Sequence, residues 1–210
     1  MTEFIRQAVA ERRLGLALHY PLLHAAVVGM NAHDTFEFGA GGSTRVILDA
    51  LPSVRSYHWS VSTETECSIR ARYGICPNAG WSHKQSTSET ARAMLNGHDD
   101  LRFDIALHDG SHAADVVAAD IAWMWPRLKH FGLLLVHDTQ HSYCGAEVRS
   151  GVIAGLRTAR AIYTATTLPF GFGLTVVRRE DGDTDVVPAP TKMGSAHSTM
   201  PLLVCEGSHG

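Results

Sequence analysis

The sequence predicts an α/β protein with a single doubly wound, mostly parallel sheet and a C-terminal antiparallel hairpin. From residue 34 onward, short apolar or β-branched runs alternate with helical stretches, which is the order of a parallel sheet covered by helices. Residues 162–168 and 173–179 then face each other across a Pro-Phe-Gly-Phe turn, which is typical of a hairpin. The length of 210 residues suits one such domain and is too short for two ordinary ones.

Most of the expected strands are rich in aromatic, β-branched or otherwise apolar residues, and residues 81–85 fit this pattern least. Of the expected helices, residues 64–73 are charged, whereas residues 112–129 and 147–160 have an apolar face. The strands are residues 34–38, 56–62, 81–85, 103–107 and 133–136. The helices are residues 44–51, 64–73, 88–96, 112–129 and 147–160. Ser43 is the expected N-cap of the first of these helices, Pro52 ends it, and Pro126 should end or kink the fourth.

Residues 1–180 are expected to form this one domain. Within it, residues 1–30 form an N-terminal helical cap, which the His-Tyr-Pro sequence at residues 19–21 divides into two helices. Residues 181–210 are rich in Gly, Pro, Asp, Ser and Thr and show little periodicity, which predicts a loosely ordered tail.

Composition and charge argue against several classes of function. The chain has 18 Lys and Arg against 21 Asp and Glu, and this net charge of −3 argues against a nucleic-acid partner. No apolar run is long enough to span a bilayer and no leader pattern is present, so no membrane partner is expected. The four cysteines lack metal-site spacing, which favours free thiols in a cytoplasmic protein.

Two similar quintets follow two of the expected strands. They read His-Asp-Gly-Ser-His at residues 108–112 and His-Asp-Thr-Gln-His at residues 137–141. Their aspartates, Asp109 and Asp138, are 29 residues apart, about the length of one strand–helix–strand crossover, so the two strands should be parallel and adjacent. Two aspartates on adjacent strand ends repel unless a cation lies between them, which predicts a divalent metal site. The alternative is a pair of histidine-rich surface loops.

A glycine-rich turn follows the first strand, in the run Glu-Phe-Gly-Ala-Gly-Gly-Ser-Thr at residues 37–44. Glycines allow a sharp turn and the close approach of a ligand to the N-terminus of a helix, although such a turn alone is a weak signal. This run resembles motif I of class I S-adenosylmethionine (SAM) methyltransferases. Residues 103–112 and 132–139 resemble two further segments of a subgroup that contains metal-dependent O-methyltransferases of the macrocin type and cephalosporin-hydroxylase-like proteins.

The resemblance covers about residues 20–180 and implies a Rossmann-like methyltransferase fold with SAM and a divalent metal as cofactors. Asp109 and Asp138 match metal ligands, and His137 lies where many relatives carry a carboxylate. His112, expected at a helix start, matches the residue proposed as general base for the acceptor hydroxyl. The cofactor pocket is expected to contain Glu37, Gly39, Ala40, Gly41, Gly42, Ser43, Ser62, Glu64 and His108.

One departure from the family pattern concerns the residue that holds the ribose. Ser62 stands where an acidic residue usually holds the ribose hydroxyls, so Glu64 must reach across or the ribose is held differently. Mg²⁺ is the expected metal because it prefers oxygen ligands, but ligation by His137 would favour a transition metal. Consecutive strand residues point to opposite faces, so His137 and Asp138 can share one ion only if the strand has already ended.

The sequence therefore predicts a SAM-dependent O-methyltransferase that uses a divalent metal to orient and activate a hydroxyl of a small-molecule acceptor. A metal-dependent hydrolase is one alternative, because phosphohydrolases also use His-Asp pairs. A non-catalytic accessory protein with the same fold is another, and Ser62 is its best support. The identity of the acceptor and assembly into a homo-oligomer are left open.

Overall fold

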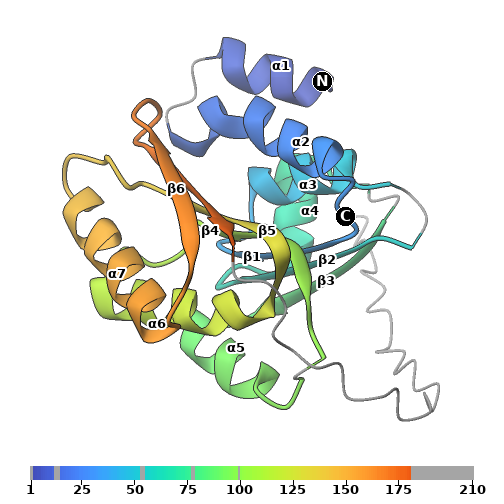
Figure 1. Ribbon diagram of the computed structural model, residues 1–210. Helices are drawn as coiled ribbons and strands as arrows, with labels where there is room; N and C mark the ends of the chain where they lie inside the picture. The colour runs from blue at the N-terminus through green and yellow to red at the C-terminus, as the bar shows by residue number, and fades with distance from the viewer. Residues whose placement is uncertain (1, 12–14, 53–54, 77–78, 99, 181–210) are drawn as a thin grey trace.

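Seven strands form one sheet at the centre of the protein, whose computed structural model describes residues 2–11, 15–52, 55–76, 79–98 and 100–180 (Figure 1). The strands are β1 (Asp34–Phe38), β2 (Tyr57–Ser62), β3 (Gly80–Gln85), β4 (Phe103–His108), β5 (Leu128–His137), β6 (Tyr163–Leu168) and β7 (Leu174–Arg179). Their order in the sheet is β3-β2-β1-β4-β5-β7-β6. The first five strands run parallel, whereas β7 is antiparallel to both β5 and β6. This confirms the predicted fold class.

Helices cover both faces of the sheet (Figure 1). One face is covered by α1 (Glu3–Ala10), α2 (Tyr20–Gly29), α3 (Gly42–Ala50) and α4 (Glu66–Tyr73). The other is covered by α5 (Ser88–Leu95), α6 (Ala114–Met124) and α7 (Gly145–Thr158). Short 3₁₀ helices span Gly15–His19 and Trp125–Arg127. None of the helices in the described part of the chain is long and apolar enough to cross a bilayer.

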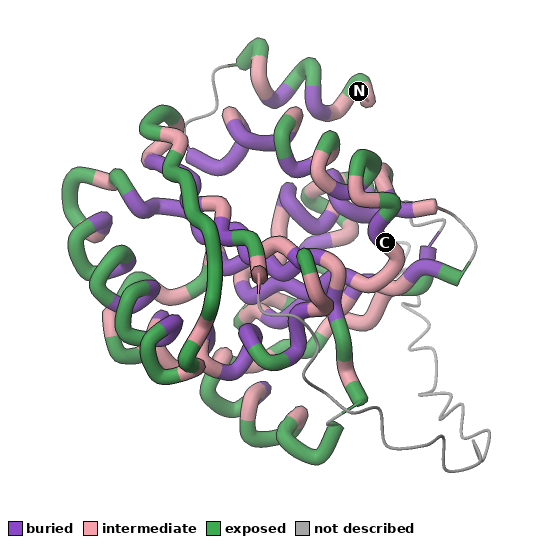
Figure 2. The backbone as a smooth tube through the Cα atoms, in the orientation of Figure 1, coloured by how far each residue is buried: buried purple, intermediate pink, exposed green. Residues whose placement is uncertain are grey.

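Residues 105–107 of β4 and 133–136 of β5 are apolar on both faces because each face packs on a helical layer. In β4, Ile105 and Leu107 belong to the core under α1–α4, whereas Phe103 and Ala106 belong to the core under α5–α7. The tube coloured by burial shows these strands as mostly buried and the edge strand β6 as exposed (Figure 2). Burial on both faces explains why these parts of β4 and β5 lack a polar–apolar alternation in the sequence.

Strands β1 and β4 are neighbours although β2 and β3 lie between them in the chain. The chain therefore continues outward in opposite directions from this pair, which makes it the switch point of the sheet. Open α/β sheets bind ligands in the crevice at the carboxyl ends of the strands on either side of such a point. The predicted pairing of β4 with β5 is also present, with His108 opposite Val136.

Several predicted boundaries differ from the structure. Residues 112–129 do not form one helix: α6 ends at Met124, a 3₁₀ turn contains Pro126, and β5 already begins at Leu128. Proline cannot donate the next helical hydrogen bond, so the chain changes direction there. Ser43 is not the N-cap of α3, because Gly41 occupies that position and Ser43 lies inside the first turn.

The cysteines also differ from expectation. Cys76 and Cys144 are free, but Cys67 is disulfide-bonded, so the prediction that all the cysteines are free thiols is wrong. The tail at residues 181–210 lies outside the described residues.

Candidate active site

A cavity of about 700 Å³ lies at the carboxyl ends of β1, β2 and β4. Seven of the nine residues predicted for the cofactor pocket line it, and they come from the glycine turn and from the end of β2. They are Gly39, Ala40, Gly41, Gly42, Ser43, Ser62 and Glu64. The cavity is large enough for a nucleoside-sized ligand and opens beside the N-terminus of α3.

The glycine turn is shaped by the close approach of β4 to β1. Gly39 has a φ of 97°, and a Cβ placed there would lie 2.1 Å from the carbonyl oxygen of Asp109. Only glycine fits that conformation without displacing the end of β4. Gly41 differs, because a Cβ there would meet nothing closer than the Tyr73 hydroxyl at 3.5 Å. Gly41 therefore faces the cavity, and its backbone N–H donates to Thr44 Oγ1 at 2.9 Å.

Glu37 does not line the cavity, contrary to the sequence-based prediction. Its side chain is fully buried and accepts hydrogen bonds from the Ser43 and Thr44 hydroxyls. His58 Nε2 lies 3.1 Å from the same carboxylate. Since Thr44 also accepts from the N–H of Gly41, Glu37 braces the first turn of α3 from below. The motif could identify Glu37 as important but could not show the direction in which it points.

His108 is a second correction. Its side chain is 1% exposed and lies on the α5–α7 side of the sheet, where Nε2 is 3.0 Å from Asp120 Oδ2. Asp120 also lies 3.0 Å from Arg92 Nε. His108 lines neither the cofactor cavity nor the neighbouring cleft, because its side chain lies on the face of the sheet that α6 covers.

Ser62 lies at the end of β2, where the family pattern has an acidic residue, and Glu64 is held close to it. Ser62 Oγ accepts from the backbone N–H of Glu64 at 3.3 Å. The Glu64 carboxylate makes a two-pronged ion pair with Arg72, with N–O distances of 2.9 Å. His83 Nε2 is 2.8 Å from the Glu64 carbonyl oxygen, which can only accept. These contacts fix Glu64 at the rim of the cavity.

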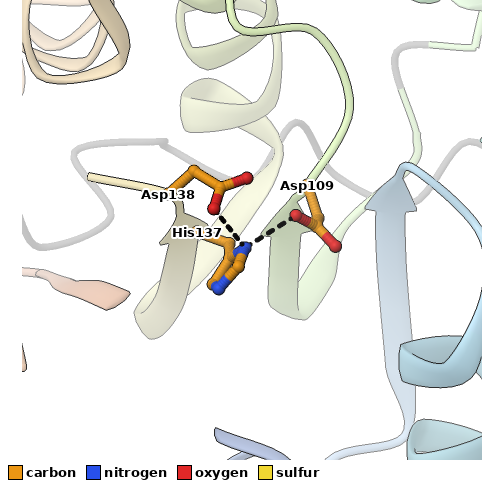
Figure 3. A group of neighbouring side chains, drawn as sticks. All are labelled: Asp109, His137 and Asp138. Carbon is orange, nitrogen blue, oxygen red and sulfur yellow. Dashed lines mark hydrogen bonds and ion pairs between the residues drawn. The ribbon is translucent and has the colours of Figure 1, made fainter. Parts of the chain in front are cut away.

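The two quintets meet as predicted. Asp109, His137 and Asp138 each offer one ligand atom, and these atoms lie within 4.8 Å of one another. Asp138 has a φ of 60°, so β5 ends there and two consecutive residues turn towards one centre. Figure 3 shows the His137 ring between the two carboxylates, with Nδ1 2.9 Å from Asp109 Oδ1 and 3.2 Å from Asp138 Oδ1. One nitrogen and two carboxylate oxygens suit a divalent cation.

These three groups shift each other's proton affinity. Burial favours the neutral ring of His137, but hydrogen bonds to Asp109 and Asp138 outweigh it and raise its pKa to about 10. Burial raises the pKa of Asp109 above its ordinary value despite the hydrogen bond with His137. Burial also opposes ionisation of Asp138, but His137 and His112 lower its pKa below the usual range. Positive charge at this centre is therefore stabilised by the two carboxylates.

His112 lies at the mouth of a cleft of about 480 Å³, in the loop before α6. The expectation that it begins the helix is wrong, since α6 starts at Ala114 and the backbone of Ala113 is extended. Its Nε2 lies 2.8 Å from Asp138 Oδ2, and its side chain is 47% exposed. The group of Asp109, His137 and Asp138, named the cation centre below, also lines this cleft. The remaining lining residues are Gly15, His141, Tyr143, Cys144 and Phe172.

Two residues that help to form the candidate site, Gly171 and Tyr73, were not predicted from the sequence. The β6–β7 hairpin loop folds over the centre, and the carbonyl oxygen of Gly171 lies 2.8 Å from His137 Nε2. Tyr73, at the end of α4, lines the cofactor cavity beside Gly41. The glycines of the hairpin loop could have indicated an unusual backbone conformation. No residue type in the sequence, however, predicts that a backbone carbonyl will accept a hydrogen bond from a given side chain.

Comparison with known proteins matches residues 36–139 to a family described as a methyltransferase domain. A search of curated proteins found no match. The O-methyltransferase TomG from Streptomyces achromogenes, solved with SAM, is 17% identical with a TM-score of 0.61, over 86% of this chain and 91% of that chain. An O-methyltransferase from Bacillus cereus, solved with S-adenosylhomocysteine (SAH), is 12% identical with a TM-score of 0.61, over 86% and 92%.

The MycE methyltransferase of the mycinamycin biosynthetic pathway, solved with Mg and SAH, is 15% identical with a TM-score of 0.55. The match covers 83% of this chain and 52% of that chain. The fold is the Rossmann-like methyltransferase fold. In this methyltransferase fold, the glycine cavity and the cation centre lie side by side at the switch point, and Asp109 lines both.

Proposed function

We propose that the protein is a SAM-dependent O-methyltransferase that uses a divalent cation to orient a hydroxyl of a small-molecule acceptor. One observation carries the proposal: Asp109 lines both the cofactor cavity and the cleft of the cation centre. A methyl donor in one and a hydroxyl in the other would meet at this residue. The family match and the O-methyltransferases of the same fold support the reaction class.

The residues present fit both groups. The cavity leaves open the space that a side chain at Gly41 would fill, and three ligand atoms converge from Asp109, His137 and Asp138. When bound, SAM supplies an electrophilic methyl group and the cation lowers the pKa of an acceptor hydroxyl. The chain holds the two reactants at neighbouring strand ends, and such positioning can supply a large share of the rate acceleration.

His112 is the proposed proton acceptor, and the contact with Asp138 assigns the atom. A carboxylate with a lowered pKa only accepts hydrogen bonds, so the hydrogen between the two groups belongs to His112 Nε2. The lone pair of a neutral ring is then at Nδ1. Asp138 orients this ring much as the aspartate of a Ser-His-Asp triad orients its histidine. The exposed position of His112 leaves it accessible to an acceptor in the cleft.

The two alternatives make different predictions. A metal-dependent hydrolase would bind the cation but not SAM, and a non-catalytic accessory protein would show no turnover. The lining of the cavity by residues 38–43 of the glycine turn favours the methyltransferase over the hydrolase.

Calorimetric titration of SAM into the purified protein tests the proposal. We expect saturable binding of one SAM per chain and competition by SAH. Methyl transfer to a vicinal-diol acceptor should stop after exhaustive chelation and return when a divalent ion is added. Absence of SAM binding, or phosphodiester hydrolysis without methyl transfer, contradicts the proposal; full activity after chelation contradicts the role of the cation.

A further inference from the structure

The cation centre differs from an all-oxygen site because the deepest of its three groups is an imidazole. The His137 side chain is only 3% exposed, whereas those of Asp109 and Asp138 are 23% and 13% exposed. Its Nδ1 is the atom that faces both carboxylates. An ion held between the two aspartates would therefore meet this nitrogen.

The other ring nitrogen of His137 already makes a hydrogen bond. Nε2 lies 2.8 Å from the carbonyl oxygen of Gly171, which has no hydrogen to donate. The hydrogen between them therefore belongs to Nε2. In a neutral ring this leaves the lone pair on Nδ1, and such a hydrogen bond on the far nitrogen is a common way to orient a metal-binding histidine.

The surroundings keep the ring in this orientation. The His19 ring packs edge-on at 5.6 Å, and Gly15 closes the other side, where an added Cβ would lie 3.8 Å from His137 Cε1. Gly171 itself has a φ of 56°, and a Cβ there would lie 2.9 Å from His19 Nε2. The loop can place its carbonyl on His137 because residue 171 is glycine.

The donor set is thus one imidazole nitrogen and two carboxylate oxygens, and it has a chemical preference. Mg²⁺ favours oxygen ligands and gives up bound water reluctantly. Imidazole is a good ligand for Fe²⁺, Co²⁺, Ni²⁺ and Zn²⁺, and the affinities of such sites rise from Mn²⁺ to Cu²⁺ and fall again at Zn²⁺.

We propose that this centre selects a divalent first-row transition-metal ion over Mg²⁺, with His137 Nδ1 as its nitrogen ligand and the Gly171 carbonyl fixing the ring. The inference rests on the cation site of the proposed function and names the ion class and the ligand atom. It makes the β6–β7 hairpin loop a positioning element of the site.

Competition between Co²⁺ and Mg²⁺ tests the selectivity without an acceptor. The chelator-treated protein is titrated with Co²⁺, and binding is followed by the visible absorption bands of the ion. We expect these bands to reach saturation at one Co²⁺ per chain and to persist in about a hundredfold excess of Mg²⁺. Loss of the bands at equal Mg²⁺, or no Co²⁺ binding, overturns the proposal.

The variant His137→Asp tests the ligand by converting the centre into an all-oxygen set. We expect the preference for Co²⁺ over Mg²⁺ to fall by at least about tenfold. The matched control is His98→Asp, at an exposed histidine in the turn after α5, and it should keep the parent preference. An unchanged preference in a folded His137→Asp protein excludes His137 as the ligand.

Nitrogen NMR of ¹⁵N-histidine-labelled parent protein loaded with Zn²⁺ tests the atom and does not depend on that variant folding. The His137 signals are assigned by their loss in His137→Gln. We expect Nδ1 to shift on Zn²⁺ binding while Nε2 keeps its hydrogen, and a metal-bound Nε2 overturns the assignment. SAM binding is measured separately, so its absence refutes the proposed methyl transfer without altering these outcomes.

Discussion

At the scale of single residues, Asp138 connects the two halves of the proposed chemistry. Its Oδ1 faces His137 Nδ1 within the cation centre, and its Oδ2 accepts a hydrogen bond from His112 Nε2. The positive φ of Asp138 makes this possible, because a residue in extended strand geometry would point away from His137. Two neighbours in sequence thereby serve one centre.

Removal of the His112 ring should lower the turnover rate without weakening the binding of SAM or the cation. General-base assistance is typically worth about 10²–10⁴-fold, so His112→Ala is expected to lower kcat by roughly that factor. Affinities for SAM and for the cation should change little, since the ring contacts Asp138 from outside the cation centre. The control is His141→Ala, which alters the same cleft and keeps the backbone hydrogen bond from His141 N–H to the Asp138 carbonyl oxygen. If His112→Ala loses the cation together with activity, His112 is a ligand and not the base.

Gly41 offers a test of the cofactor cavity. Gly41→Val should abolish SAM binding in calorimetry, because the new side chain occupies cavity space next to Tyr73. The fold should persist, since the Cβ itself makes only an ordinary contact. Gly97→Val is the matched control, because nothing lies within 4 Å of the added Cβ there. Unchanged SAM affinity in Gly41→Val would remove the turn from the cofactor site.

At the scale of elements, the first turn of α3 depends on a buried network beneath it. Glu37 accepts from Ser43 and Thr44 and lies against His58, and all four side chains are inaccessible or nearly so. A carboxylate suits this position because every neighbour can donate. The position of the turn is therefore set by a strand residue that never reaches the cavity.

Glu37→Gln should weaken both the fold and the cofactor site. One amide nitrogen would face donors it cannot accept from, so the free energy of unfolding should fall by roughly 1–3 kcal/mol in urea titrations. SAM affinity should fall as well because the turn loses its brace. Glu66→Gln weakens a half-exposed ion pair with Arg70 and should cost less than about 1 kcal/mol. Parent-like stability and SAM affinity in Glu37→Gln would show that the charge of Glu37 is dispensable.

The elements also show what sequence can and cannot predict. β1 was predicted with its observed bounds because Thr35, Phe36 and Phe38 are β-branched or aromatic and a glycine follows. The meeting of Asp109 and Asp138 followed from two apolar runs one crossover apart. The start of β5 was missed because Phe131, with a φ of 61°, interrupts the strand pattern before Gly132. The directions of Glu37 and His108 depend on which helix covers each face, which single-strand patterns do not contain.

At the scale of the whole molecule, the sheet has a carboxyl edge, where the parallel strands end, and an amino edge, where they begin, and the two have different roles. The carboxyl edge carries the cavity and the cation centre. The amino edge holds β1, β4 and β5 together: Asp104 Oδ2 accepts from the backbone N–H groups of His33 and Asp34 at 2.8 and 2.9 Å. Lys129 Nζ bridges Asp34 and Asp104 at 2.7 and 2.9 Å. Stability can therefore be changed at one edge without altering the groups at the other.

Acid titration of stability tests this separation. Burial alone would raise the pKa of Asp104, but the N–H groups of Asp34 and His33 and the Lys129 ammonium outweigh it and lower the pKa. The unfolded chain therefore binds this proton more readily than the folded protein does, and the contribution of Asp104 is present at neutral pH and lost as pH falls below about 4. Asp104→Asn should cost about 1 kcal/mol at pH 7, because the pair is partly exposed.

Urea unfolding between pH 3 and pH 7 should then give a smaller loss of stability on acidification in Asp104→Asn than in the parent, with the two curves converging at the acid end. SAM affinity and cation affinity at pH 7 should equal those of the parent, since Asp104 lines neither the cavity nor the cleft. Parallel curves would mean that folding leaves the pKa of Asp104 unchanged. A variant that keeps its stability but loses SAM would mean that the two edges are coupled through β4, and the division of tasks across the sheet would be wrong.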